Sequence, residues 1–121
     1  MAGVEVKNVS SPDETRDFSG QGESAVITVA GRPALYSVFQ PGFRWSEHVK
    51  PIVGTDDCEA THFMYILSGR RGIAHNDGTE AEVGSGDVVV IEPGHDAWVV
   101  GDETFKAIDF GGYARFGLPS S

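Results

Sequence analysis

The residues of this chain that are best suited to chemistry are histidines and its one cysteine. In the stretch IEPGHDAWVV, residues 91–100, His95 directly follows a Pro-Gly turn within a β-prone run. His48, Cys58 and His62 lie earlier in the chain. Neutral imidazole nitrogens and a thiolate sulfur are ligands for divalent transition metals. These four residues are therefore candidate metal ligands, although a buried cysteine also serves as a small apolar residue.

Short β-prone runs separated by turn residues make up most of the chain from residue 25 onward. Turn signals recur about every 8–12 residues, which is typical of an all-β sandwich or barrel. No stretch keeps a helical period with a capping residue, so helices are expected to be minor. The run VVVI is apolar at every position, which is typical of a strand covered on both faces or lying at a closed edge. The predicted strands are residues 26–30, 34–40, 63–67, 72–75, 79–83, 88–92, 97–100 and 104–110.

The length of 121 residues predicts one domain. Residues 1–24 are rich in Ser, Gly and acidic residues and are expected to form an extended or flexible N-terminal segment. The barrel is expected over residues 25–112, followed by a C-terminal tail, residues 113–121. The aromatic residues Tyr113 and Phe116 of this tail either pack against a barrel end or a neighbouring subunit, or belong to a frayed terminus.

The charge of the chain limits the classes of partner. Eighteen Asp and Glu residues against nine Lys and Arg residues give a formal net charge of −9. Such a surface repels phosphate backbones and anionic membranes, so neither nucleic acid nor a membrane is expected as a partner. The single cysteine allows no intrachain disulfide, and the start MAGVEVKNVS lacks the regions of a signal peptide, so a cytoplasmic location is expected. The sequence contains no GxSxG, P-loop, GxGxxG or CxxC motif.

Three segments carry a family resemblance. They are PGFRWSEH at residues 41–48, HFMYILSG at residues 62–69 and GDVVVIEPGHDAW at residues 86–98. Together they resemble the two motifs of the cupin superfamily, and the likeness spans residues 34–110. The resemblance implies an all-β fold, a cupin-type jelly-roll β-barrel of short antiparallel strands. It also implies a homodimer, because cupins commonly pair through their outer sheet and terminal strands.

The resemblance implies a metal site whose usual ligands are only partly present. Cupins bind a divalent metal such as zinc, iron, manganese or nickel through three histidines and one glutamate. His48 matches the first histidine of the pattern, and His62 takes the place of the glutamate. Lys50 stands where the second histidine belongs, and a protonated amine has no lone pair for a metal. Ala97 occupies the position of the last histidine.

A third donor is needed beside His48 and His62, because two imidazoles alone seldom hold a metal. His95 lies two residues before the vacated position at Ala97 and faces the same way if the chain is extended there. Cys58 precedes His62 by four residues, and its thiolate would favour zinc or another thiolate-tolerant transition metal. The carboxylates of Asp96 and Glu47 are further candidates, although carboxylates in turns usually bond the local backbone or water. Without a third donor, the histidine pair would be hydrogen-bonded and metal-free.

Two functions follow from these alternatives. The first is a metal-dependent enzyme of dioxygenase, isomerase, lyase or cyclase type that acts on a small organic substrate in the barrel, with His48, His62 and Lys50 as catalytic candidates. Lys50 would bind a substrate carboxylate or move a proton there, or else it points into solvent. The second function is a metal-free module that binds or senses a small ligand through apolar contacts together with His48, His62 and Arg44.

Overall fold

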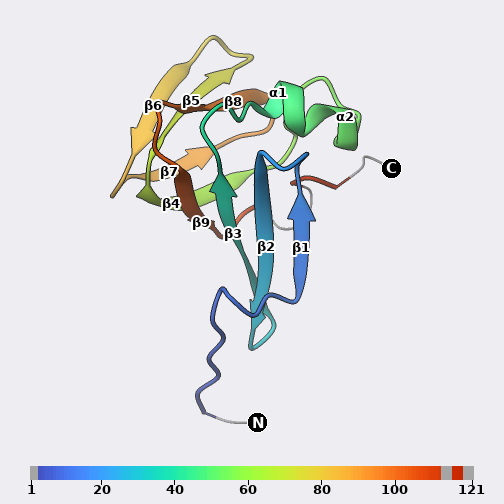
Figure 1. Cartoon of the computed structure of the whole chain (residues 1–121), viewed down its shortest axis with the longest axis vertical. Helices are drawn as coiled ribbons and strands as arrows, with labels where there is room; N and C mark the ends of the chain where they lie inside the picture. Colours follow the sequence, from blue (N-terminus) through green and yellow to red (C-terminus); the bar gives the residue numbers. More distant parts are fainter. Residues whose placement is uncertain (1–2, 113–115, 119–121) are drawn as a thin grey trace.

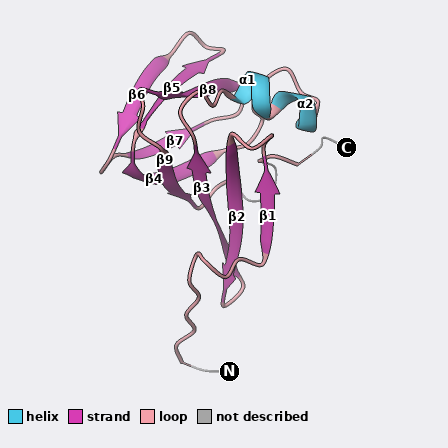
Figure 2. Ribbon diagram, viewed as in Figure 1, coloured by secondary structure: helices cyan, strands magenta, loops and turns pink. Residues whose placement is uncertain are grey.

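The computed structural model describes residues 3–112 and 116–118, and it arranges them mainly as antiparallel strands (Figures 1 and 2). In chain order the elements are β1 (Glu14–Asp17), β2 (Gly22–Val29), β3 (Arg32–Phe39), α1 (Trp45–His48), α2 (Lys50–Val53), β4 (His62–Ser68), β5 (Arg70–His75), β6 (Glu80–Gly84), β7 (Val88–Ile91), β8 (His95–Val100) and β9 (Phe105–Asp109). The two helices have four residues each. The predictions of an all-β fold and of minor helices are confirmed.

Two antiparallel sheets enclose one apolar core. The larger sheet has the strand order β1-β2-β3-β9-β4-β7, and the smaller sheet has the order β6-β5-β8. Buried side chains of both sheets belong to the same hydrophobic cluster. Figure 1 shows β5, β6 and β8 on one side of the molecule and the long strands β2 and β3 on the other. Residues on facing strands are therefore brought together across the interior, whatever their distance in the sequence.

Alternation along the strands decides which side chains reach that interior. In β4, His62, Met64 and Ile66 are buried while the residues between them are exposed. In β8, His95 and Ala97 are buried in the same alternating pattern. Because successive side chains of a strand point to opposite faces, His62 and His95 both point inward.

Strand β7 lies at an edge of the larger sheet. Its all-apolar sequence is also typical of a strand covered on both faces, but β7 is not covered in this way. It pairs only with β4 among the described strands, and Val88 and Val90 are 64% and 57% exposed. Phe63 and Tyr65 of β4 are also about half exposed beside them. These exposed apolar residues lie on the outer face of the larger sheet. They do not by themselves establish a dimer, so the expected homodimer stays a prediction.

The sheet begins before the boundary expected at residue 25. Residues 14–17 form β1 and pair with β2, which starts at Gly22. Phe18 is fully buried, and its ring centroid lies 5.3 Å from that of Phe116. The polar sequence of β1 fits a strand at the sheet edge, because its side chains stay wet while its backbone pairs. Tyr113 of the tail lies outside the described residues.

The Phe18→Ala change tests whether this early segment belongs to the folded core. Removing a fully buried aromatic ring should lower the free energy of unfolding by about 3–5 kcal/mol, measured by urea denaturation. Val6→Ala is the matched control, because Val6 is 81% exposed and its loss should change stability little. Equal effects of the two changes would contradict the placement of Phe18.

Candidate metal centre

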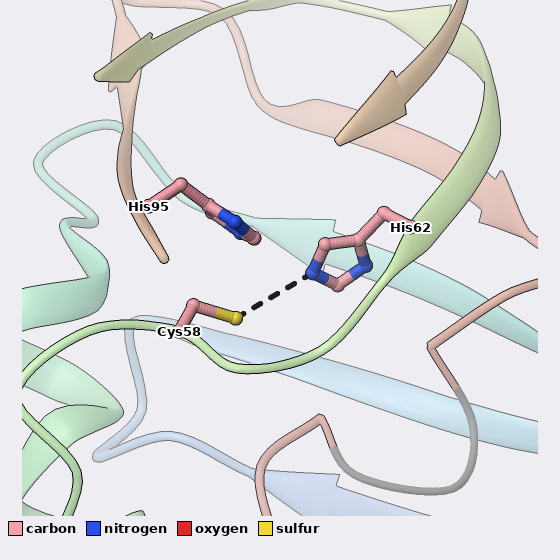
Figure 3. A group of neighbouring side chains, drawn as sticks. All are labelled: Cys58, His62 and His95. Carbon is pink, nitrogen blue, oxygen red and sulfur yellow. Dashed lines mark hydrogen bonds between the residues drawn. The ribbon is translucent and has the colours of Figure 1, made fainter. Parts of the chain in front are cut away.

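Cys58, His62 and His95 converge inside the barrel (Figure 3). One potential ligand atom of each residue lies within 4.8 Å of those of the other two. All three side chains are buried, with 3%, 1% and 0% of their surface exposed. A sulfur and two imidazoles that meet in a closed interior form a donor set typical of a transition-metal site.

Each of the three residues is held by backbone pairing. His62 is the first residue of β4 and His95 is the first residue of β8. Cys58 lies on the connection before β4 and forms an isolated β-bridge with His95. The Cys58 amide donates to the His95 carbonyl at 2.8 Å, and the Gly94 amide donates to the Cys58 carbonyl at 2.8 Å. Gly94 has a φ of 97°, which a residue with a side chain rarely adopts, so glycine is needed at this turn.

Asp109 fixes the orientation of the His62 ring. His62 Nδ1 donates to the Asp109 carboxylate. The other carboxylate oxygen accepts hydrogen bonds from the backbone amides of Phe63, Gly111 and Gly112. Burial alone would raise the pKa of the Asp109 carboxyl, but the hydrogen bonds from His62 and from the backbone outweigh it and hold the pKa below its ordinary value. The ionised carboxylate keeps the proton on Nδ1 and leaves the Nε2 lone pair of His62 free to bind.

His95 presents a second free lone pair. Its Nδ1 lies 2.8 Å from the carbonyl oxygen of Glu92, which only accepts, so Nδ1 carries the proton. The Nε2 atom is buried and has no hydrogen-bond partner among the described residues. Burial, and secondarily the nearby His62, lower the pKa of His95 to about 3, so the imidazole is neutral. An unpartnered acceptor in an apolar interior is costly, and a metal ion would satisfy it.

Cys58 completes the donor set. Its sulfur lies 3.6 Å from His62 Nε2, and burial raises the pKa of the thiol to about 11. In the absence of a cation the thiol therefore stays protonated and donates a hydrogen bond to His62 Nε2. Two ligands of one tetrahedral zinc ion, at its usual sulfur and nitrogen distances, are also about 3.6 Å apart. The spacing of Cys58 and His62 therefore fits a shared metal ion.

His48 does not join this cluster, although the sequence predicts it as the first ligand. Residues 45–48 form α1, and His48 is the last residue of that helix. Its Nδ1 lies 3.1 Å from the backbone oxygen of Arg44, and its ring stacks on Phe43 at 5.7 Å between centroids. His48 is therefore tied to the local turn, and its predicted roles as metal ligand and catalytic residue receive no support from the geometry.

Lys50 also lies away from the cluster. It begins α2, and its side chain is 43% exposed with Nζ 3.9 Å from Asp56 Oδ1. Of the alternatives for this residue, the solvent-facing one agrees with the structure. Glu47 is exposed. Asp96 accepts hydrogen bonds from Ser46 Oγ at 2.9 Å and from Arg44 at 3.2 Å, so it anchors α1 to β8.

Sequence reasoning found three of the four residues that build this centre and missed Asp109. One feature of the sequence could have indicated Asp109. It is an acidic residue at a buried position of an alternating strand, shortly before Gly111 and Gly112. A side chain at Gly112 would lie 2.6 Å from Asp109 Oδ2 and 2.9 Å from His62 Nδ1. Glycine is therefore required where the backbone approaches the pair of polar side chains.

Comparisons with known proteins identify the fold. No family model and no curated protein matches the sequence. Among solved structures, an RmlC-like cupin from Shewanella frigidimarina is similar, with a TM-score of 0.58 and 17% identity over 92% of this chain and 95% of that chain. A protein with a double-stranded β-helix domain from Klebsiella pneumoniae has a TM-score of 0.57 and 18% identity over 88% and 85% of the two chains. FeII HppE has a TM-score of 0.59 and 10% identity over 90% of this chain and 60% of its own.

These likenesses establish the fold, and the predicted cupin-type β-barrel is confirmed. At such low identities they carry no more than the fold, so function is argued from the residues of this chain. None of the described helices is long and apolar enough to cross a membrane.

The buried histidines predict how stability depends on pH in the metal-free protein. Burial lowers the pKa values of His62 and His95, whereas histidines in an unfolded chain take up protons below about pH 6.5. The free energy of unfolding should therefore be highest above about pH 6.5. Toward pH 3 it should fall by about 1.4 kcal/mol per pH unit for each histidine that is protonated in the unfolded chain but not in the folded protein. Asp109, whose pKa is also lowered, adds to the loss in the acid range.

Urea unfolding in the presence of a chelator, at several values between about pH 7 and pH 5, measures this dependence. His95→Gln removes one of the two buried histidines, so the free energy of unfolding should depend less steeply on pH. A stability that is constant over this range in the unmodified protein would contradict the neutral, buried state of the two histidines.

Proposed function

We propose that this protein is a metal-dependent enzyme that holds one divalent transition-metal ion through Cys58, His62 and His95 and acts on a small organic molecule in the barrel. The observation that carries the proposal is the buried Nε2 of His95, which lacks a partner among the described residues beside two other donors. The likeness to the iron-containing FeII HppE agrees with a metal in such a barrel.

The donor set favours zinc among the divalent ions. Thiolate and imidazole together suit zinc, whereas manganese and magnesium sites are built mainly from oxygen donors. Three protein ligands would leave a coordination position for water or substrate, as in catalytic zinc sites. A bound zinc ion supplies Lewis acidity and lowers the pKa of a bound water. Because zinc has no redox chemistry, the ligands favour an isomerase, lyase or cyclase type of reaction over a dioxygenase.

The residues around the ligands prepare them for the ion. Asp109 keeps the His62 proton on Nδ1, and the Glu92 carbonyl does the same for His95. Both Nε2 lone pairs are therefore available without a change of tautomer. Cys58 must lose its thiol proton when it binds the ion, so metal affinity should rise with pH.

Elemental analysis of the purified protein tests the proposal. The unmodified chain should contain about one zinc ion per molecule, and His95→Ala and Cys58→Ser should lose most of it. His48→Ala is the matched control and should keep the metal, because His48 bonds the Arg44 backbone and lies outside the cluster. Circular dichroism confirms that each variant is folded.

Substitution with cobalt gives a second readout of the same site. Cobalt in the unmodified protein should show a near-ultraviolet thiolate charge-transfer band that disappears in Cys58→Ser. A folded protein that takes up neither zinc nor cobalt would contradict the proposal and would favour the metal-free ligand-binding module instead.

Asp109→Asn tests the orienting hydrogen bond separately. Weakening the carboxylate partner of a metal-binding histidine typically lowers metal affinity by about 10- to 100-fold, measured by competition with a coloured chelator. Asp96→Asn is the control, because Asp96 bonds Ser46 and Arg44 and no residue of the cluster. Equal losses of affinity in the two variants would contradict the role of Asp109.

A further inference from the structure

The barrel interior holds a second polar group without partners, the guanidinium of Arg71. This residue lies on β5, and only 3% of it is exposed. Its Nε and Nη2 atoms are buried and have no hydrogen-bond partner among the described residues. A guanidinium stays charged in proteins, and a buried charge that lacks hydrogen bonds is strongly disfavoured.

The surroundings of Arg71 position its side chain without neutralising it. The carbon at the centre of the guanidinium lies 5.8 Å from the ring centroid of Phe39 and 5.7 Å from that of Phe105. The Nη1 atom is 3.9 Å from the sulfur of Met64. Aromatic faces and a thioether are weak partners for a cation. The remaining edge, formed by Nε and Nη2, is therefore the part that lacks an acceptor.

The neighbouring Arg70 shows what this edge binds when an acceptor is present. Arg70 donates from Nε at 3.0 Å and from Nη2 at 2.6 Å to one carboxylate oxygen of Glu82. The side chain of Arg70 is 55% exposed, because successive residues of a strand point to opposite faces. Arg71 presents the same pair of donors to the barrel interior, where the described residues provide no carboxylate for them.

The negative charges that act on Arg71 come from two residues of the candidate metal centre, Cys58 and Asp109, and from Asp96. A bound divalent ion would be balanced by the Cys58 thiolate and the Asp109 carboxylate, while His62 and His95 are neutral. The remaining carboxylate, Asp96, pairs with Arg44 at 3.2 Å, so none of the acidic side chains that act on Arg71 is left to balance its charge. Electrostatics in a buried site of this kind favours the entry of one anionic group.

The strand pairing of β5 with β8 brings Arg71 and the candidate metal ligand His95 to the same barrel interior. Arg71 pairs with Val99 of β8, and Ile73 pairs with Ala97, which is followed toward the strand start by His95. Val99, Ala97 and His95 are all buried on one face of β8. Between His95 and the level of Arg71, this face carries the fully buried Ala97, which contributes only a methyl group.

From these observations we propose that the small molecule bound beside the metal centre carries a carboxylate, which accepts hydrogen bonds from Nε and Nη2 of Arg71. This inference rests on the function proposed above and adds its substrate class, a small organic acid. Arg71 would recognise and orient the acid, since a planar carboxylate matches two parallel donors.

Calorimetric titration of the zinc-loaded protein with succinate, acetate and inorganic phosphate tests this inference. At least one of the two carboxylates should bind, and more tightly than phosphate. Arg71→Met should weaken that binding by about 10- to 100-fold, and Arg71→Lys should weaken it less, because the charge stays and the paired donors are lost. Arg70→Met is the matched control and should bind like the unmodified protein, since it loses only the surface pair with Glu82.

Thermal unfolding gives a readout that a purely structural arginine would not affect. The carboxylate that binds should raise the unfolding temperature of the unmodified protein and of Arg70→Met, but not of Arg71→Met. Binding that is the same in Arg71→Met, preferred binding of phosphate, or no binding of either carboxylate would overturn the inference. Zinc content separates the two proposals: a protein with zinc but without Arg71-dependent binding refutes only the acid, whereas a protein without metal refutes the proposed centre.

Discussion

A histidine buried in an apolar barrel needs a partner for each ring nitrogen, and this requirement organises the centre of the molecule. For His62 the Asp109 carboxylate receives the Nδ1 proton, and for His95 the Glu92 carbonyl does so. The two Nε2 atoms are left on the inner side, one beside the Cys58 sulfur and one without a partner among the described residues. Of the ring nitrogens of these two histidines, only His95 Nε2 is without a partner among the described residues, and a group that accepts an electron pair would satisfy it.

The cupin barrel supplies the rigid frame that this arrangement needs. His62 and His95 each open a strand, so their backbones are fixed by ladder hydrogen bonds at the same end of facing sheets. Cys58 has no strand of its own, but its bridge to His95 gives it comparable support. Ligands held in this way lose little conformational freedom when an ion binds, which favours affinity.

Local patterns in the sequence predict the strands because turn residues and apolar alternation are themselves local. They also indicate His95, since a position two residues before Ala97 on an extended chain shares its face. His48 is predicted as a ligand only from its match to the family pattern, and that match does not reveal that residues 45–48 form α1. The extension of the sheet to β1 is missed because an edge strand needs no apolar alternation.

Asp109 and Arg71 escape prediction for a different reason. Each stands in a run whose pattern is ordinary for a strand, and each acquires its role only from residues on other strands. Asp109 is distant in sequence from His62, and Arg71 is one of two adjacent arginines that sequence alone does not distinguish. Tertiary structure makes one of the pair a surface ion-pair partner and the other an interior cation.

The buried charge of Arg71 is costly to the stability of the barrel. An apolar side chain at position 71 would avoid the cost of burying a charge, so packing and folding alone do not account for an arginine beside Phe39 and Phe105. The chain as a whole is acidic, with a net charge of −9, and such a surface gives an anion no general attraction. The proposed acid ligand would therefore need a local attraction: the two donors of Arg71, together with a cation held by Cys58, His62 and His95, would offset the repulsion that the ligand meets at the surface.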